Sequence, residues 1–278
     1  MMDALQEPFF LRALLAGLLA AVACGIVGTL IVVRQIASIS GGLSHAAFGG
    51  VGLGYLLRFD PLLGAALFSL GCGLGIGAAY RHQRTGLDTL IAMVWSIGMA
   101  LGMVFIALSP GYAPDLMSYL FGSILFVPTS FIAIAAGLDV VVVVATVLLY
   151  RRLQAITFDE EFAAVLGVPV GPLFYGLLAV IALTVVVLIR IVGVILAIAL
   201  LTIPAATARQ WSDDLRVVML IAIGIGALCT TAGLFLSYGL SARLEMNMPT
   251  GPLIILVAAT VYGLSVIASR LRHGREKV

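Results

Sequence analysis

The sequence predicts an all-α, polytopic membrane protein with about eight transmembrane helices. Of its 278 residues, 62% are hydrophobic and only 10% are charged, whereas about a quarter of the residues of a soluble domain are charged. Its mean hydropathy is +1.20. Most of the uncharged runs exceed the ~20 residues that a helix needs to cross a bilayer. We expect one transmembrane domain over residues 1–278.

The charged residues divide the chain into nine hydrophobic helices, because a charge near the bilayer centre costs at least ~2.5 kcal/mol. In chain order these helices cover 13–33, 35–57, 61–80, 89–114, 130–150, 171–189, 191–208, 217–242 and 246–269. A short re-entrant or surface segment is expected near 116–127, before Pro128. The pair around Arg190 leaves little room for a loop, so one member is expected as a half-helix, and eight or nine crossings are both open.

Arginine clusters predict the orientation, because positive charges accumulate on the cytoplasmic side. The clusters are Arg81/Arg84, Arg151/Arg152 and residues 270–277. This arrangement places 110–115 and 239–249 outside. Asp3 and Glu7 precede a first apolar run that is too long for a signal peptide, so the first helix is expected to be retained. We expect a multi-pass protein of the cell inner (plasma) membrane.

The composition also excludes classes of function. The 15 basic residues are scattered, so nucleic acid is not an expected partner. The sequence contains no phosphate-binding loop, so ATP hydrolysis requires another protein. The spans contain no catalytic pair, so the chain is not expected to be an enzyme. Three cysteines, Cys24, Cys72 and Cys229, lie in separate apolar stretches and are expected to be packing residues.

Glycine is abundant, at 31 residues, and gathers inside the predicted helices. The runs are Gly49-Gly50-x-Gly52-x-Gly54, Gly71-x-Gly73-x-Gly75-x-Gly77 and Gly98-x-x-x-Gly102. Small residues let membrane helices approach closely, so we expect these runs to be mainly packing seams.

His45 is the one histidine within an apolar run of the sequence. An ionisable residue at that depth is a functional hypothesis by default. Neutral imidazole binds zinc and similar divalent metals, and Gly41 and Gly49 leave its face open. A transient metal ligand is one interpretation. The other is a core histidine bonded to a nearby carbonyl or to Ser44.

The segment 157–168 predicts a short amphipathic helix on the cytoplasmic face, at about 158–168. Thr157 or Asp159 caps its start, acidic residues suit its N-terminal dipole, and Gly167 ends it. The acidic residues are Asp159, Glu160 and Glu161, and the apolar ones are Phe162, Val165 and Leu166. Such a helix docks into a groove of a partner protein or lies on the lipid headgroups.

Pro204 lies within the apolar segment 192–209 and frees a carbonyl in the middle of a helix. Thr202 and Thr207 are close enough in sequence to satisfy that carbonyl. Broken helices often line transport pathways, so Pro204 is a candidate pathway residue.

Ser237 and Tyr238, followed by Pro249 and Thr250, are expected to close an external hairpin. Ser237, Tyr238 and Thr250 are therefore candidate residues of an outer gate. A rigid extracellular turn is the alternative.

Taken in this order, these stretches resemble the membrane permease subunits of zinc/manganese/iron ABC importers, over nearly the whole chain. Those permeases carry an Arg-rich turn, an Asp-Ala-x-Ser-His-Ala-x-x-Pro-Gly stretch, a cytoplasmic acidic-aromatic-Ala-x-x-x-Gly loop, a Val-Gly-x-x-Leu…Ile-Pro-Ala-Ala-x-Ala helix and a late Ser-Tyr…Pro-Thr-Gly-Pro pair. The matching positions here are Arg34, Leu43-Ser44-His45-Ala46, 159–167, 192–208 and 237–252.

The resemblance implies a homodimer enclosing a pathway, two cytoplasmic ABC ATPase subunits and an extracytoplasmic metal-binding delivery protein. It implies that His45 is a pathway ligand and that 159–167 is the coupling helix. It also implies that the metal is a transported ion, Zn²⁺ or else Mn²⁺ or Fe²⁺, and not a stably bound cofactor.

Two positions depart from the family. Gly41 replaces an acidic residue one turn before the histidine, and Gly49 replaces a proline. Loss of a hard oxygen ligand favours zinc over manganese. Ser40, Ser44 or the histidine of a second protomer are possible compensating ligands. Import of a chelate such as haem or a siderophore and ATPase-independent ion transport are the alternatives.

Overall fold

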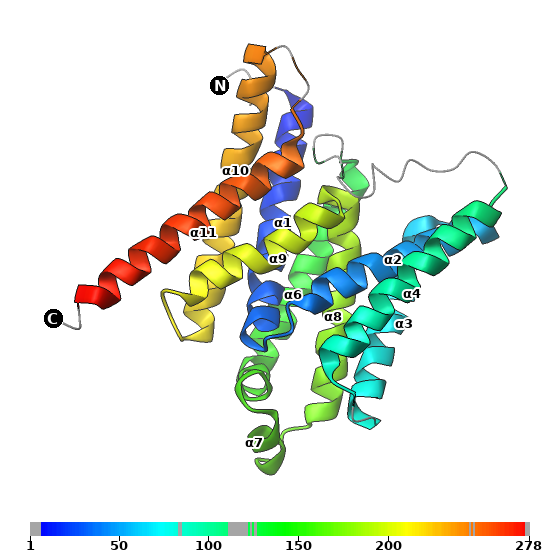
Figure 1. Ribbon diagram of the computed structural model, residues 1–278, viewed down its shortest axis with the longest axis vertical. Coiled ribbons are helices and arrows are strands. Elements are labelled where there is room, and N and C mark those ends of the chain that lie inside the picture. Colours follow the sequence, from blue (N-terminus) through cyan, green and yellow to red (C-terminus); the bar gives the residue numbers. More distant parts are fainter. Residues whose placement is uncertain are drawn as a thin grey trace.

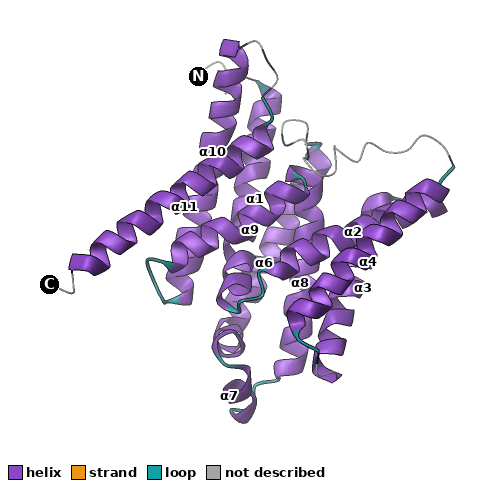
Figure 2. Ribbon diagram, in the orientation of Figure 1, coloured by secondary structure: helices purple, strands orange, loops and turns teal. Residues whose placement is uncertain are grey.

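The computed structural model describes residues 7–82, 85–110, 122, 124, 127–244, 246 and 248–275. These ranges form ten α-helices (Figures 1 and 2). The helices are α1 Pro8–Val33, α2 Ser38–Leu57, α3 Pro61–His82, α4 Leu87–Leu108, α6 Thr129–Phe158, α7 Glu160–Val165, α8 Val170–Val192, α9 Val194–Arg209, α10 Leu215–Leu244 and α11 Thr250–Arg275. The predicted all-α fold with nine hydrophobic helices and one short helix after residue 158 is confirmed. The re-entrant segment expected near 116–127 lies largely outside the described residues.

Seven of the helices are long and apolar enough to cross a membrane. The two other hydrophobic helices are α2, which is rich in glycine, and α9, which has only 16 residues. At 1.5 Å per residue, α9 spans roughly 24 Å, which is less than the ~30 Å hydrocarbon core. The shorter member predicted for the pair around Arg190 is therefore α9.

The helix axes alternate in direction along the chain, from α1 to α11 (Figure 1). The helices α8 and α9 also run in opposite directions, and Gly193 joins them with φ +83° and ψ 165°. A positive φ of this kind costs glycine little and an L-side chain more, so a single residue is able to reverse the chain here. Arg81, at the end of α3, and α7 lie at one end of the bundle, as the charge clusters predict.

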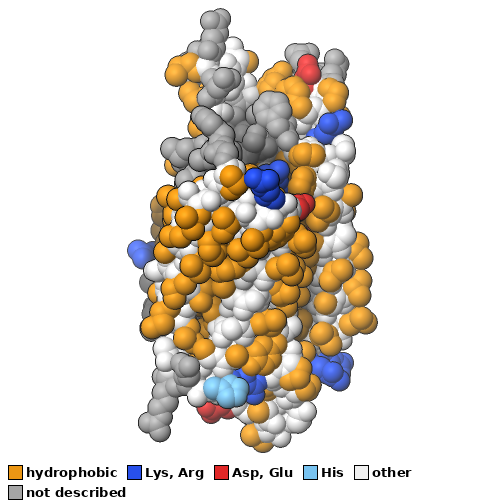
Figure 3. Space-filling view, turned by 90° about the vertical axis from the view of Figure 1, so that its right-hand side faces the viewer, with side chains coloured by type: hydrophobic (Ala, Val, Ile, Leu, Met, Phe, Trp, Pro, Cys, Tyr) orange, Lys and Arg blue, Asp and Glu red, His pale blue; other side chains and the backbone are white. Residues whose placement is uncertain are grey.

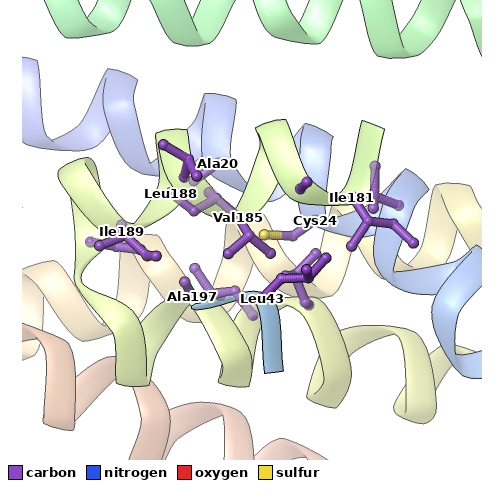
Figure 4. Close-up of a cluster of buried hydrophobic side chains, with 14 of the residues drawn as sticks. Ala20, Cys24, Leu43, Ile181, Val185, Leu188, Ile189 and Ala197 are labelled. Atoms are coloured by element: carbon purple, nitrogen blue, oxygen red, sulfur yellow. The ribbon is translucent and has the colours of Figure 1, made fainter. Parts of the chain in front are cut away.

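The bundle is organised around α1 and α8. On one side, α2 packs between α3 and α4, and the other side is formed by α10 and α11 with α9 (Figure 1). Between them, a cluster of buried apolar side chains joins α1, α2, α8 and α9 (Figure 4). Cys24 lies in this cluster beside Val185 and Leu43. All three cysteines are free thiols; Cys24 and Cys229 are buried and Cys72 packs against the core, as expected of packing residues.

The outer surface carries the apolar side chains that a membrane requires. Figure 3 shows one face on which hydrophobic side chains cover much of the middle, while charged groups lie both in its upper part and at its lower end. On α6, Val147 and Leu148 are 70% and 77% exposed. Exposed aliphatic side chains at this density indicate contact with lipid rather than water.

Glycines of α2 and α4 form a packing seam, as predicted. A Cβ atom added at Gly98 would lie 2.6 Å from the Cα of Ala46, and one at Gly52 would lie 2.6 Å from the carbonyl oxygen of Gly102. In the run on α3, Gly73 faces α8, but a Cβ atom added at Gly71 or Gly75 would meet no atom of another described element within 4 Å. The expectation of a packing seam is therefore wrong for those two glycines within one protomer.

We expect Gly98→Ala to destabilise the protein by about 1–3 kcal/mol, because its methyl group would overlap the backbone of α2, which cannot move without repacking. Gly75→Ala is the matched control, since the same methyl group meets open space there. Thermal unfolding in detergent measures both. Equal midpoints for the two variants would contradict the assignment of the seam.

Candidate functional site

His45 is positioned by α2, which is anchored at its N-terminal end. The chain leaves α1 through a turn in which Gln35 has φ +59° and the N–H of Ile36 donates to the carbonyl of Ile31 (3.0 Å). At the first residue of α2, the hydroxyl of Ser38 donates to Asp88 Oδ1 on α4 (2.6 Å). These contacts set where α2 begins, so they also set the height of His45 in the bundle.

The imidazole of His45 stacks on the indole of Trp95, which comes from α4. The ring centroids are 4.5 Å apart and the planes differ by 14°. His45 is half-buried and Trp95 is 38% exposed. Stacking covers one π face of the imidazole, whereas its nitrogen lone pairs lie in the ring plane. Either nitrogen therefore stays available to a ligand.

The alternative interpretation, a core histidine bonded to a nearby carbonyl or to Ser44, requires a hydrogen bond that the described contacts do not include. The hydroxyl of Ser44 is buried and has no hydrogen-bond partner among the described residues. The described contacts of the imidazole include no hydrogen bond to a carbonyl or side chain. The residue is thus held by its ring stack and leaves its polar atoms unpaired.

The other predicted residues of this stretch surround His45 differently. Ser40 is fully buried, and its hydroxyl donates to the carbonyl of Ala37 (2.8 Å). Ser44 is 1% exposed. Both serines therefore point into the protomer, whereas His45 is partly exposed. Gly41 faces Trp95, because a Cβ there would lie 2.9 Å from Cζ3 of the indole.

The described part of one protomer contains no group of three or more His, Cys, Asp or Glu side chains that could hold a metal ion. A single histidine does not bind a divalent ion tightly. The described residues of one protomer therefore do not form a site of three such side chains around His45.

The second predicted element, α7, forms at the end of α6. Asp159 is its N-cap and accepts a hydrogen bond from the N–H of Phe162 (2.8 Å). Thr157 instead donates to the carbonyl of Leu153 (2.6 Å), so Asp159 is the cap of the two candidates. Gly167 ends the helix with φ +78°, and the N–H of Val168 donates to the carbonyl of Ala163 (3.0 Å). This pair of features is a Schellman motif.

One side of α7 packs against the bundle, and the other side is exposed. Ala163 is fully buried in a small cluster with residues of α6 and α8. The large apolar side chains that remain exposed are Phe158, Phe162, Val165 and Leu166. An exposed apolar surface of this kind indicates a contact with a partner protein or with lipid headgroups, the two alternatives that the sequence leaves open.

Arg34 connects α7 to the turn between α1 and α2. Its Nη2 lies 2.9 Å from Oε2 of Glu160, its Nη1 donates to the carbonyl of Ile156 (2.7 Å), and its guanidinium lies 5.0 Å from the ring centre of Phe174. The Arg34 side chain is 8% exposed. Sequence reasoning placed Arg34 only in a family turn and missed its partner, because the two residues lie 126 positions apart.

The expectation for Pro204 needs correction. The helix α9 continues through Pro204, and the break in this region lies at Gly193 instead. Thr202 donates to the carbonyl of Ile198 (2.8 Å) and Thr207 to that of Ile203 (2.7 Å). Each threonine therefore bonds the carbonyl one turn before itself, and neither satisfies the carbonyl freed by the proline.

The hairpin predicted between Tyr238 and Thr250 exists, but it lies far from His45. Ser237 donates to the carbonyl of Met248 (2.9 Å), which joins α10 to the start of α11 at Thr250. Tyr238 packs on the ring of Phe10 in α1, with centroids 5.6 Å apart. These helices lie across the molecule from α2 (Figure 1). The structure does not bring the two candidate stretches together within one protomer.

Known proteins are similar in sequence to this chain over nearly its whole length. A sequence model of the ABC 3 transport family matches residues 6–269. An uncharacterized membrane protein of Synechocystis sp. is 44% identical over 270 residues, covering 97% of this chain and 94% of that protein. The manganese import system permease protein ScaB of Streptococcus parasanguinis is 32% identical over 275 residues, covering 98% of this chain and 96% of that protein.

A solved structure shows the same fold. The structure of PsaBC from Streptococcus pneumoniae in complex with Fab matches with a TM-score of 0.82 and 30% identity, covering 95% of this chain and 93% of that chain. Together with the multi-pass helical bundle, these matches show that the chain belongs to the ABC 3 transport family, as the membrane-spanning permease subunit of an ABC transporter.

Proposed function

We propose that this permease imports a divalent transition metal and that Zn²⁺ is its preferred cargo. The observation that carries the proposal is His45, a half-buried histidine on α2 whose nitrogens have no described hydrogen-bond partner and whose neighbour one turn earlier is Gly41. Imidazole binds zinc well, whereas manganese prefers carboxylate and carbonyl oxygens. The metal is substrate, bound transiently and released.

The second candidate cargo is Mn²⁺. It is favoured by the name of ScaB, a manganese import system permease that is 32% identical to this chain. Water and backbone carbonyls would then have to supply the oxygen ligands that Gly41 does not.

The proposed complex contains two copies of this chain, two cytoplasmic ABC ATPase subunits and an extracytoplasmic metal-binding protein. One protomer does not assemble three ligands in its described part, so a homodimer with two copies of His45 facing one pathway is the simplest way to complete a site. An ion that is held by so few ligands dissociates readily, as a transporter requires.

Coupling to ATP hydrolysis is proposed to run through α7. Movement of the ATPase would displace α7, and Arg34 would pass this displacement to the turn before α2 through its bonds to Glu160 and Ile156. Because α2 begins three residues after that turn's Gln35, the helix that carries His45 would move with it. Rigid helices joined at a fixed contact transmit such shifts.

The exposed apolar side chains of α7 are expected to bind the ATPase. Phe162→Ala and Val165→Asp should weaken binding of the ATPase by roughly 1–3 kcal/mol each, which copurification detects. The first variant loses an aromatic anchor, and the second places an unpaired charge in the interface. Leu148→Ala is a matched control, because that exposed apolar side chain lies within α6, a proposed span. ATPase retained equally by all three variants would contradict docking at α7.

The function is tested by reconstituting the chain with its ATPase and delivery protein in liposomes. ATP-dependent uptake of Zn²⁺, Mn²⁺ and Fe²⁺ is measured in competition. Zinc-selective uptake supports the proposal, and manganese-selective uptake supports the second candidate. Uptake of none of the three ions would overturn both.

A further inference from the structure

Trp95 of α4 touches both positions of α2 that set the chemistry of the proposed site. Its indole stacks on the imidazole of His45 at 4.5 Å. The six-membered part of the same indole faces Gly41, since a Cβ at position 41 would lie 2.9 Å from Cζ3 and 3.3 Å from Cη2. One side chain therefore spans the histidine and the position one helical turn before it.

The two contacts are mutually dependent. A side chain at position 41 would have to displace the indole, because 2.9 Å is shorter than any ordinary contact between carbon atoms. Trp95 is 38% exposed, so the ring has room to rotate away. Rotation would remove the stack that orients His45. The glycine at position 41 and the oriented imidazole thus require each other.

We propose that Trp95 is a positioning and specificity-determining residue of the metal pathway. Its indole holds the plane of the His45 imidazole and fills the space in which a carboxylate from position 41 would lie. The arriving ion then meets a nitrogen ligand without an oxygen ligand beside it. This chemistry selects zinc over manganese. The inference rests on the proposed role of His45 as an ion ligand.

The neighbouring glycine shows that the contact at Gly41 differs from general packing. Gly42 also faces α4, but a Cβ there would meet the side chain of Ile91, at 2.5 Å, and not the indole. Gly42→Ala is therefore a matched control for a disturbed contact between α2 and α4 that leaves the stack on His45 in place.

The experiment uses the reconstituted complex and measures KM and maximal rate for Zn²⁺ and for Mn²⁺. Trp95→Ala is expected to raise the KM for Zn²⁺ about threefold to tenfold, the effect of losing an aromatic stack, and Trp95→Phe should restore most of it. Gly41→Asp with Trp95→Ala is expected to shift the ratio of Mn²⁺ to Zn²⁺ uptake toward Mn²⁺ by about tenfold or more relative to the wild type. Gly41→Asp alone should produce a smaller shift, because the indole still competes for that space.

A spectroscopic measurement tests the stack independently of transport. In a Trp211→Phe background, Trp95 is the only tryptophan left in the 278-residue sequence, which has two. Addition of Zn²⁺ to the purified permease should change its emission, and His45→Ala should abolish that change. Gly42→Ala should keep it.

The outcomes separate this inference from the proposed function. If His45→Ala leaves uptake intact, the role of His45 as a ligand fails and the inference fails with it. If uptake depends on His45, but Trp95→Ala changes neither the KM nor the ratio of Mn²⁺ to Zn²⁺ uptake, only the role of Trp95 is overturned. Equal effects of Gly42→Ala and Trp95→Ala on that ratio would also overturn it.

Discussion

Replacement of His45 by alanine is expected to lower ATP-dependent metal uptake by at least roughly 10–100-fold, because loss of only an outer-shell partner of a metal ligand already costs that much. The imidazole is the one side chain of α2 that combines a good metal ligand with partial exposure and unpaired nitrogens. Removing it from a homodimer would remove both copies at once. Uptake of Zn²⁺ in proteoliposomes at several concentrations measures the loss.

Assembly of the variant must be checked in the same preparation. His45→Ala leaves the packing seam between Gly98 and Ala46 untouched, so copurification with the ATPase should persist. His82→Ala is a matched control, because His82 is exposed at the end of α3 and bonds only the carbonyl of Ala78 (2.9 Å) among the described contacts. Uptake unchanged by His45→Ala, or equally reduced by His82→Ala, would leave His45 as a packing residue.

Charge reversal at Glu160 is expected to uncouple ATP hydrolysis from uptake, whereas the same change at Glu161 has a much smaller effect. Glu160 accepts a charge-assisted bond from the nearly buried Arg34 (2.9 Å), and Glu161 is exposed. Glu160→Lys would place a second positive charge against Arg34 and lose a bond of about 1.5–3 kcal/mol. The number of ATP molecules hydrolysed per Zn²⁺ ion transported should therefore rise.

The contact is also probed from its other side. Arg34→Lys keeps the charge but loses the fork that reaches Glu160 and the carbonyl of Ile156 together, so it should raise the same ratio by less than Glu160→Lys. A ratio that is the same for Glu160→Lys and Glu161→Lys would mean that the ion pair does not carry the coupling. The effect would then come from the net charge of α7.

Much of the fold was predictable because it depends on residues close together in the chain. Hydropathy and the positions of the charged residues predict nine hydrophobic helices, because burying an ion in the bilayer is energetically unfavourable. The ends of α7 were predictable for a similar reason. The cap by Asp159 and the turn at Gly167 are formed by hydrogen bonds that span three to five residues.

The site was predictable only in part. The sequence alone makes His45 a candidate metal ligand, with a packed core histidine as the alternative, and the absence of a carboxylate at Gly41 is visible there too. The roles expected of Thr202 and Thr207 were wrong in detail, because a threonine in a helix has its own carbonyl one turn earlier within reach. Nothing in their spacing distinguishes that bond from one to the carbonyl freed by Pro204.

The fold class and the approximate helix ends could be predicted from sequence patterns alone, and so could the candidate residues for binding a metal or a partner. Only the tertiary structure decided that Trp95 covers His45 and faces Gly41, and that Arg34 joins Glu160 to the turn before α2. Helix formation follows from local hydrogen bonds and burial, which sequence patterns record. Contacts between helices depend on the rotation and crossing of two separate axes, and those are fixed by packing across the whole bundle.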